Sequence, residues 1–130
     1  MNKLKDLKLV QKPWGEECWF ALVPGAYLGK IIIVYPGERT SLHYHRYKEE
    51  TLYVAEGTLV YQVEEKGKKK EKIFSCGEFV HVPPETKHSL GAPRDRKVVL
   101  FEVSTCYPED SIRVEDGYGR EVTKVKEQEW

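Results

Sequence analysis

Cysteine is scarce in this chain of 130 residues. Cys18, Cys76 and Cys106 are an odd number, lie far apart and form no C-x-x-C pair. This pattern excludes a disulfide scaffold and a zinc knuckle. Because free, unpaired cysteines are typical of a reducing compartment, we expect a cytoplasmic protein.

The chain also lacks an excess of charge of either sign. Lys and Arg together number 21, as do Asp and Glu, so the formal net charge is zero. This balance gives no electrostatic reason to expect nucleic acid or an anionic membrane as a partner. The longest apolar run, "IIIVY" at 31–35, is far too short to span a membrane, and the Lys-rich beginning lacks the apolar region of a signal peptide.

No helix of ordinary length is indicated, and short strand patterns dominate instead. β-branched and aromatic residues alternate with polar ones in segments that glycine, proline or charged turns separate. Many short strands at close spacing predict an all-β antiparallel sandwich or barrel. The ends are ambiguous: 1–10 fits one helical turn or an edge strand, and 119–130 fits either type. The predicted strands are 16–23, 28–35, 51–57, 58–65, 71–76, 78–83 and 97–105.

Two histidines stand one residue apart in "SLHYHRYKEETLYVAEG", residues 41–57. In an extended segment His43 and His45 point to one face and Tyr44 to the other. Either Glu49 or Glu50 returns a carboxylate to the same place. Neutral imidazole is the commonest metal ligand and a carboxylate adds negative charge, so the stretch predicts one edge of a metal site.

The wider spacing is G-x5-H-x-H-x4-E-x6-G from Gly37 to Gly57, followed by Gly77, Pro83 and His88. This resembles the two-motif signature of the cupin superfamily across 37–92. Two positions depart from it: Glu85 stands where the family usually has glycine, and Ala92 where it has asparagine. The resemblance implies a double-stranded β-helix (jelly roll) forming one cupin domain over 1–130.

The resemblance also implies a metal ion inside the jelly roll, held by His43, His45, Glu50 and His88. Three imidazoles and a carboxylate leave one or two coordination positions for water or substrate. We expect one divalent ion, zinc first, with manganese, iron, nickel or cobalt as alternatives. The spacing to Gly57, where a tight turn favours a left-handed backbone, favours Glu50 over Glu49.

Two segments near the ends of the chain indicate a particular group within the cupin superfamily. "KPWGEEC" at 12–18 and "EDSIRVEDGYGR" at 109–120 are similar to the cupin domain of type II phosphomannose isomerases. This implies a metal-dependent sugar-phosphate isomerase that interconverts mannose 6-phosphate and fructose 6-phosphate through an enediol. The nucleotidyltransferase half that many of these relatives carry has no counterpart in the sequence. A small sugar phosphate is the expected partner.

Such a reaction needs a general base and an anion clamp. Glu102 interrupts the apolar stretch "VVLFEV" and is the favoured base, provided that it points inward, where burial would raise its pKa. His81, which alternates with Val80 and Val82, is the weaker candidate, and we expect it to be half-buried in a strand. Arg120 and Arg113 are the candidates for binding the phosphate or the enediolate.

Several other side chains receive structural interpretations. We expect Lys30 and Arg39 to face solvent, and the run "EKGKKKEK" at 65–72 to form a hairpin tip. Most aromatic residues in the predicted strands should lie in the core: Trp19, Tyr35, Tyr53, Tyr61 and Phe101.

Two other functions stay open, because one fold hosts many chemistries. One is a different metal-cupin enzyme, such as an oxygenase or a lyase acting on a small acid. The other is a non-catalytic cupin that binds a sugar or a sugar phosphate. We also expect a homodimer, with "LKLVQKPWG" at 7–15 covering an open edge strand.

Overall fold

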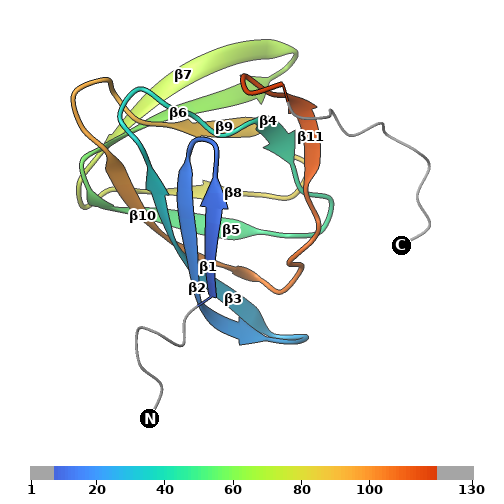
Figure 1. Cartoon of the computed structure of the whole chain (residues 1–130). Coiled ribbons are helices and arrows are strands. Elements are labelled where there is room, and N and C mark those ends of the chain that lie inside the picture. The colour runs from blue at the N-terminus through green and yellow to red at the C-terminus, as the bar shows by residue number, and fades with distance from the viewer. Residues whose placement is uncertain (1–7, 120–130) are drawn as a thin grey trace.

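The computed structural model describes residues 8–119, which form two antiparallel sheets and no helix (Figure 1). The larger sheet has the strand order β1-β2-β3-β10-β5-β8, and the smaller has the order β11-β4-β9-β6-β7. The strands are β1 Lys8–Lys12, β2 Gly15–Val23, β3 Tyr27–Val34, β4 Leu42–Tyr44, β5 Glu50–Glu56, β6 Thr58–Glu65, β7 Lys68–Ser75, β8 Phe79–Val82, β9 His88–Gly91, β10 Val98–Thr105 and β11 Ile112–Glu115. The predicted all-β jelly roll is confirmed.

Each predicted strand has a counterpart. Of the ambiguous N-terminal segment, residues 8–10 belong to the edge strand β1, and 1–7 lie outside the described residues. Three strands escaped prediction: β4, β9 and β11. All three have only three or four residues, which is too short for alternation to be distinguished from chance. Of the ambiguous C-terminal segment, 120–130 lies outside the described residues.

The lysine-rich run is only partly a hairpin tip. Lys66 and Gly67 have positive φ angles of 51° and 75°, as a two-residue hairpin turn of type I′ requires. The following lysines belong to β7, which pairs with β6 along its whole length. The strand thus begins earlier than predicted, because cross-strand pairs with Glu64 and Glu65 accommodate Lys68 and Lys69.

The core lies between the two sheets and follows from alternation along the strands. The inward positions carry aliphatic side chains that are almost completely buried: Leu28, Val34, Leu52, Val54, Leu59, Val98 and Leu100. Trp14, next to the start of β2, packs into the same core and is 4% exposed. Two aromatic residues expected in the core, Tyr53 and Phe101, are instead 43% and 44% exposed because they occupy outward positions.

Gly57 and Glu85 also adopt left-handed backbone. Gly57 has a φ of 80°, and a Cβ there would lie 2.4 Å from the carbonyl oxygen of Lys97, so only glycine fits this corner. Glu85 also has a positive φ, 66°, at the position where cupins usually have glycine. Its backbone N–H donates to the carbonyl of His45 at 2.6 Å. The chain therefore keeps the left-handed turn despite the missing glycine.

Nothing within 8–119 is a helix that could cross a lipid bilayer.

Candidate metal centre

Three imidazoles converge at one end of the space between the sheets. His43 in β4 pairs directly with His88 in β9, and His45 follows the end of β4. One ring nitrogen from each lies within 4.8 Å of the other two. The short strands β4 and β9 thus bring two histidines together that are far apart in the sequence.

Hydrogen bonds at the far side of each ring fix the same tautomer. The Nδ1 atom of His43 lies 2.7 Å from the carbonyl oxygen of Ser41, that of His45 2.5 Å from Asp110, and that of His88 2.8 Å from Thr86. Because a carbonyl oxygen only accepts hydrogen bonds, each Nδ1 carries the hydrogen. The Nε2 lone pairs stay available for a metal ion.

Burial also favours the neutral rings that metal binding requires. It lowers the pKa of His43 well below its ordinary value, and the charges that His88 and His45 would carry lower it further. Burial likewise lowers the pKa of His45 to about 4, although the carboxylate of Glu50 acts in the opposite direction.

Glu50, the first residue of β5, places a carboxylate oxygen beside two of the three imidazoles. Its Oε1 atom lies 3.1 Å from Nε2 of His88 and 3.8 Å from Nε2 of His45. Because Nδ1 of His88 carries the ring hydrogen, its Nε2 lone pair faces a lone pair of the Glu50 oxygen. This contact is repulsive unless a cation or a second ring proton lies between the two atoms. Two ligands that each bind an ion at about 2.1 Å, at roughly a right angle, are about 3 Å apart, so the donor set fits a divalent metal.

Glu49, the alternative carboxylate, points away from this cluster. It is exposed, and its Oε2 atom lies 2.5 Å from Nε2 of His81. The expectation that His81 is half-buried is wrong: its side chain is 52% exposed, because the outward position in β8 faces solvent.

Lys48 is the residue of this cavity that sequence reasoning missed. It is 5% exposed, and its Nζ atom lies 3.2 Å from Oε2 of Glu50 and 2.9 Å from Oε2 of Glu102. Burial would lower the pKa of Lys48, but the two carboxylates outweigh it and raise that pKa. Glu50 therefore directs one oxygen to the imidazoles and the other to a buried ammonium group.

Glu102 in β10 points inward and is 3% exposed. The hydroxyl of Ser104 donates to its Oε2 atom at 3.1 Å. Burial and the neighbouring charge of Glu50 raise the pKa of Glu102 to about 6, against the opposing charges of Lys48 and Lys30. A carboxyl group with this pKa is ionised at neutral pH yet more basic than an ordinary glutamate.

Asp110 holds the loop between His45 and Glu50 in place through hydrogen bonds. Its carboxylate accepts the backbone N–H groups of Arg46, Tyr47 and Lys48 at 3.0, 2.7 and 2.9 Å. Burial would raise the pKa of Asp110, but these donors lower it below its ordinary value. The same residue also accepts the ring hydrogen of His45, so it supports a candidate ligand and the loop together.

Lys30 does not face solvent as expected but is 7% exposed at an inward position of β3. Its Nζ atom lies 3.2 Å from Oε1 of Glu17 and 4.3 Å from the ring centre of Trp19. The carboxylate and the aromatic face together compensate the buried ammonium group.

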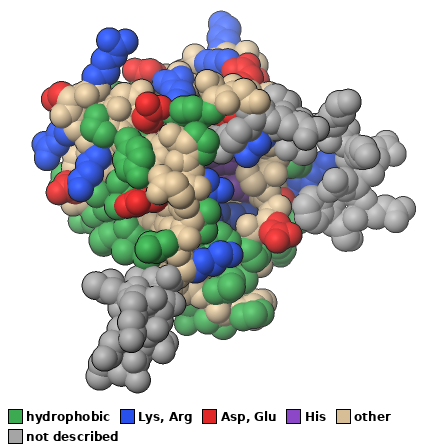
Figure 2. Space-filling view, viewed as in Figure 1, with side chains coloured by type: hydrophobic (Ala, Val, Ile, Leu, Met, Phe, Trp, Pro, Cys, Tyr) green, Lys and Arg blue, Asp and Glu red, His purple; other side chains and the backbone are tan. Residues whose placement is uncertain are grey.

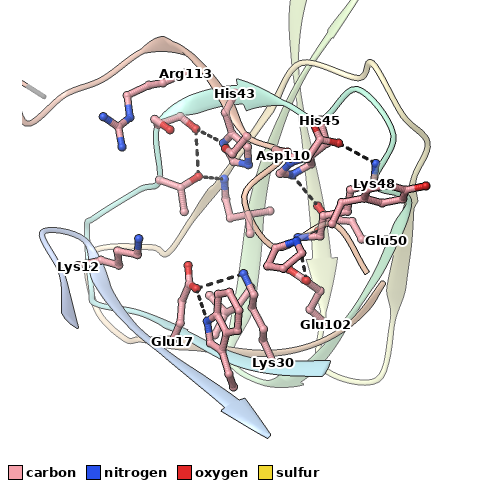
Figure 3. A pocket seen from close by; sticks show the side chains of 18 of the residues that line it. Lys12, Glu17, Lys30, His43, His45, Lys48, Glu50, Glu102, Asp110 and Arg113 are labelled. Carbon is pink, nitrogen blue, oxygen red and sulfur yellow. Dashed lines mark hydrogen bonds and ion pairs between the residues drawn. The ribbon is translucent and has the colours of Figure 1, made fainter. Parts of the chain in front are cut away.

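His43 and His45 line a cavity of about 170 Å³, visible in Figure 2 as purple surface at the bottom of a hollow. Figure 3 shows the labelled side chains around it, which come from several strands and loops, with Lys12 and Arg113 on the side away from Glu50 and Glu102. Arg113 lines it from β11, at the position that pairs with His43. Arg120 lies outside the described residues. The cationic lining residues are Lys12, Lys30, Lys48 and Arg113, and the acidic ones are Glu17, Glu50, Glu102 and Asp110.

Residues 30–104, more than half of the chain, match the family model of the cupin domain. The chain belongs to the cupin family. No curated protein matches this cupin.

Solved structures show the same fold at low sequence identity. The capsular polysaccharide assembling protein CapF from Staphylococcus aureus is 20% identical with a TM-score of 0.74, over 85% of this chain and 34% of CapF. Oxalate decarboxylase OxdC from Bacillus subtilis (S161A mutant) is 19% identical with a TM-score of 0.72, over 85% of this chain and 31% of that one. KdgF from Halomonas sp. is 16% identical with a TM-score of 0.66, over 79% of this chain and 89% of KdgF. This cupin thus spans about a third of CapF and of the decarboxylase.

Proposed function

We propose that this cupin is a metal-dependent enzyme that isomerises a small sugar phosphate, with mannose 6-phosphate and fructose 6-phosphate as the expected pair. One observation carries the proposal. The buried carboxylate of Glu102 lines the same cavity as His43 and His45 and is linked to Glu50 through the ammonium group of Lys48. The cavity thereby combines a candidate base with a candidate metal centre.

His43, His45, His88 and Glu50 would hold one divalent ion. Neutral imidazoles with fixed Nε2 lone pairs, together with an ionised carboxylate, suit zinc and the other first-row ions named above. A structure of the oxalate decarboxylase, which shares the fold, describes Mn(II) centres in that protein. When bound, such an ion polarises the carbonyl and hydroxyl oxygens of a substrate.

Glu102 would move the proton that the isomerisation requires. Its carboxylate removes the proton from carbon 2 of the aldose, which leaves an enediolate with negative charge on the oxygen of carbon 1. A proton passes from the oxygen on carbon 2 to the oxygen on carbon 1, and Glu102 returns its own proton to carbon 1 to give the ketose. A pKa of about 6 suits both directions near neutral pH. Lys48 keeps the ionised carboxylate in place and adds positive charge beside the oxygen on which negative charge develops.

Arg113 would bind the phosphate at the mouth of the cavity. A guanidinium group forms paired hydrogen bonds with phosphate oxygens, and Lys12 lines the same side of the cavity. Arg120 remains a second candidate for this role from the sequence resemblance.

The test is turnover of mannose 6-phosphate by protein loaded separately with zinc, manganese, iron, nickel or cobalt. We expect fructose 6-phosphate to form, and Glu102→Gln to lower kcat by about 10²–10⁴ without loss of the metal. Glu49→Gln, a carboxylate outside the cavity, is the matched control and should leave turnover unchanged. Absence of turnover on every hexose phosphate with every metal would overturn the isomerase.

A second candidate is a lyase or oxygenase that acts on a small carboxylic acid. The fold shared with oxalate decarboxylase favours it, as do the basic side chains of Lys12 and Arg113 in the lining of the cavity, which could bind a carboxylate. Release of carbon dioxide or consumption of oxygen with a small dicarboxylate, in place of sugar-phosphate turnover, would identify this chemistry. Binding of a sugar phosphate without turnover would instead identify a binding module.

A further inference from the structure

The outward face of the larger sheet is apolar, although 32% of the chain is charged. Burial alternates along the three central strands, which separates inward from outward positions. The inward set contains Lys30, Glu50 and Glu102, whereas the outward set has one charged residue, Glu56, at the end of β5, where it pairs with Val99. The uncharged outward residues are Tyr27, Gly29, Ile31, Ile33, Thr51, Tyr53, Ala55, Val99, Phe101, Val103 and Thr105.

Cross-strand pairing joins the largest of these side chains into one row. Phe79 pairs with Tyr53, Tyr53 with Phe101, Phe101 with Ile31, and Ile31 with Cys18. The rings of Tyr53 and Phe101 are stacked with their centres 6.3 Å apart. The row therefore crosses five neighbouring strands, from β8 through β5, β10 and β3 to β2.

The exposed area is large enough for a stable interface. Phe79 is 65% exposed, Val103 59%, Phe20 47%, Phe101 44% and Tyr53 43%. With about 200 Å² for each of these large side chains, they leave about 500 Å² of apolar surface in water. An interface that is about 60% apolar would then bury about 800 Å² per partner, the usual size of a specific interface.

We propose that this face, defined by Phe20, Tyr53, Phe79, Phe101 and Val103, packs against the same face of a second copy of the chain. A two-fold axis places identical patches on each other, so apolar surface meets apolar surface and no charge is buried. The charged groups lie around the patch: the pair Glu49 and His81 on one side, and Lys97 and Glu56 on another. An apolar centre with a charged rim is the usual anatomy of an interface.

This surface differs from the open edge of β1, where Leu9 is 74% exposed. It also lies on the back of β10, whose inward side carries Glu102, so pairing would support the strand behind the cavity. The inference does not depend on which reaction the cavity performs.

Sedimentation velocity of the full chain at micromolar concentrations tests the proposal. We expect a dimer for the parent protein and a monomer for Phe101→Lys and for Phe79→Lys. Two matched controls should stay dimeric: Ile73→Lys, which changes a 56% exposed residue in β7 of the other sheet, and Leu9→Lys at the edge. Circular dichroism and a thermal melt verify that each variant is folded. If Phe101→Lys does not fold, Phe79→Lys alone tests the interface.

Three results would overturn the proposal. The parent protein could be monomeric throughout the concentration range. A dimer could persist in both folded face variants. Dissociation could also follow from Leu9→Lys alone, which would place the interface at the edge strand instead.

Discussion

The ammonium group of Lys48 lies 2.9 Å from the carboxylate of Glu102, and both side chains are buried in the cavity that His43 and His45 line. The same ammonium group also forms an ion pair with Glu50, at 3.2 Å from its Oε2 atom. One buried cation thus neutralises two buried carboxylates, one a candidate metal ligand and the other a candidate base. The stability of the protein and the basicity of Glu102 both depend on this arrangement.

Lys48→Met should strongly destabilise the metal-free protein. The substitution leaves two carboxylates buried without their cation, which costs about 3–5 kcal/mol in comparable cases. Urea unfolding at neutral pH measures the loss. Lys97→Met, which removes an exposed partner of Glu56 at 3.9 Å, should change little. If Lys48→Met were as stable as the parent, the ion pairs would not be holding the cavity together.

The pH dependence of turnover should report the ionisation of Glu102. Because a base must be ionised to accept a proton, kcat/KM should rise with pH through about 6, the pKa to which burial and Glu50 raise this group. Glu102→Gln should abolish this rise along with most of the activity. A rise with the same midpoint in the residual activity of Glu102→Gln would assign the ionisation to another group.

Asp110→Asn should lower stability by about 1–2 kcal/mol, because both carboxylate oxygens accept backbone N–H groups and the amide keeps only one acceptor oxygen. At least one N–H group then loses its acceptor, and the remaining hydrogen bonds become neutral. The pKa of Asp110 in the folded protein lies below its ordinary value of about 4. The carboxylate therefore makes its full contribution to the free energy of unfolding above the ordinary value, and this contribution is lost as the pH falls through the folded pKa. The difference in unfolding free energy between Asp110→Asn and the parent should therefore be larger at pH 7 than at pH 3. Asp95→Asn, in an exposed loop, should show no such difference. An equal gap at both pH values would argue against the loop's dependence on this charge.

Glu85→Gly should stabilise the protein by about 0.5–1 kcal/mol. A left-handed backbone is costly for any residue with a Cβ, and glycine relieves that cost while losing some entropy on folding. Glu85→Ala keeps the Cβ and should give no gain, which separates backbone strain from loss of the carboxylate. Thermal melts of the three proteins compare them. A destabilised glycine variant would mean that the Glu85 side chain contributes more than its backbone costs.

The fold and the convergence of the histidines could be predicted because both follow from regular spacing. Alternation identified most strands, and the fixed intervals between His43, His45, Glu50 and His88 needed no knowledge of the tertiary structure. Lys48 could not be predicted in this way. It stands in the charged run "RYKEE", where nothing local distinguishes a buried lysine from a solvated one. Its burial follows from Glu102, which lies across the sheet on β10.

Which residues of the larger sheet point inward was difficult to predict for a related reason. When a strand carries apolar residues at both odd and even positions, as β3, β5 and β10 do, alternation does not show which face points inward. Hence Tyr53 and Phe101 were expected inside and lie outside, and Lys30 was expected outside and lies inside. In a typical sheet the charged residues face solvent, whereas in this one several charged residues point inward, toward the cavity.

Metal binding by the purified, chelator-treated chain tests the central claim most directly. Titration calorimetry with zinc, supported by elemental analysis, should give one ion per chain. The stoichiometry should be lost in His88→Ala and His43→Ala and retained in His81→Ala, which changes an exposed histidine outside the cluster. Circular dichroism of each variant establishes that the fold is intact. The account would be contradicted if the parent chain bound no divalent ion, or if folded His88→Ala bound one ion as tightly as the parent.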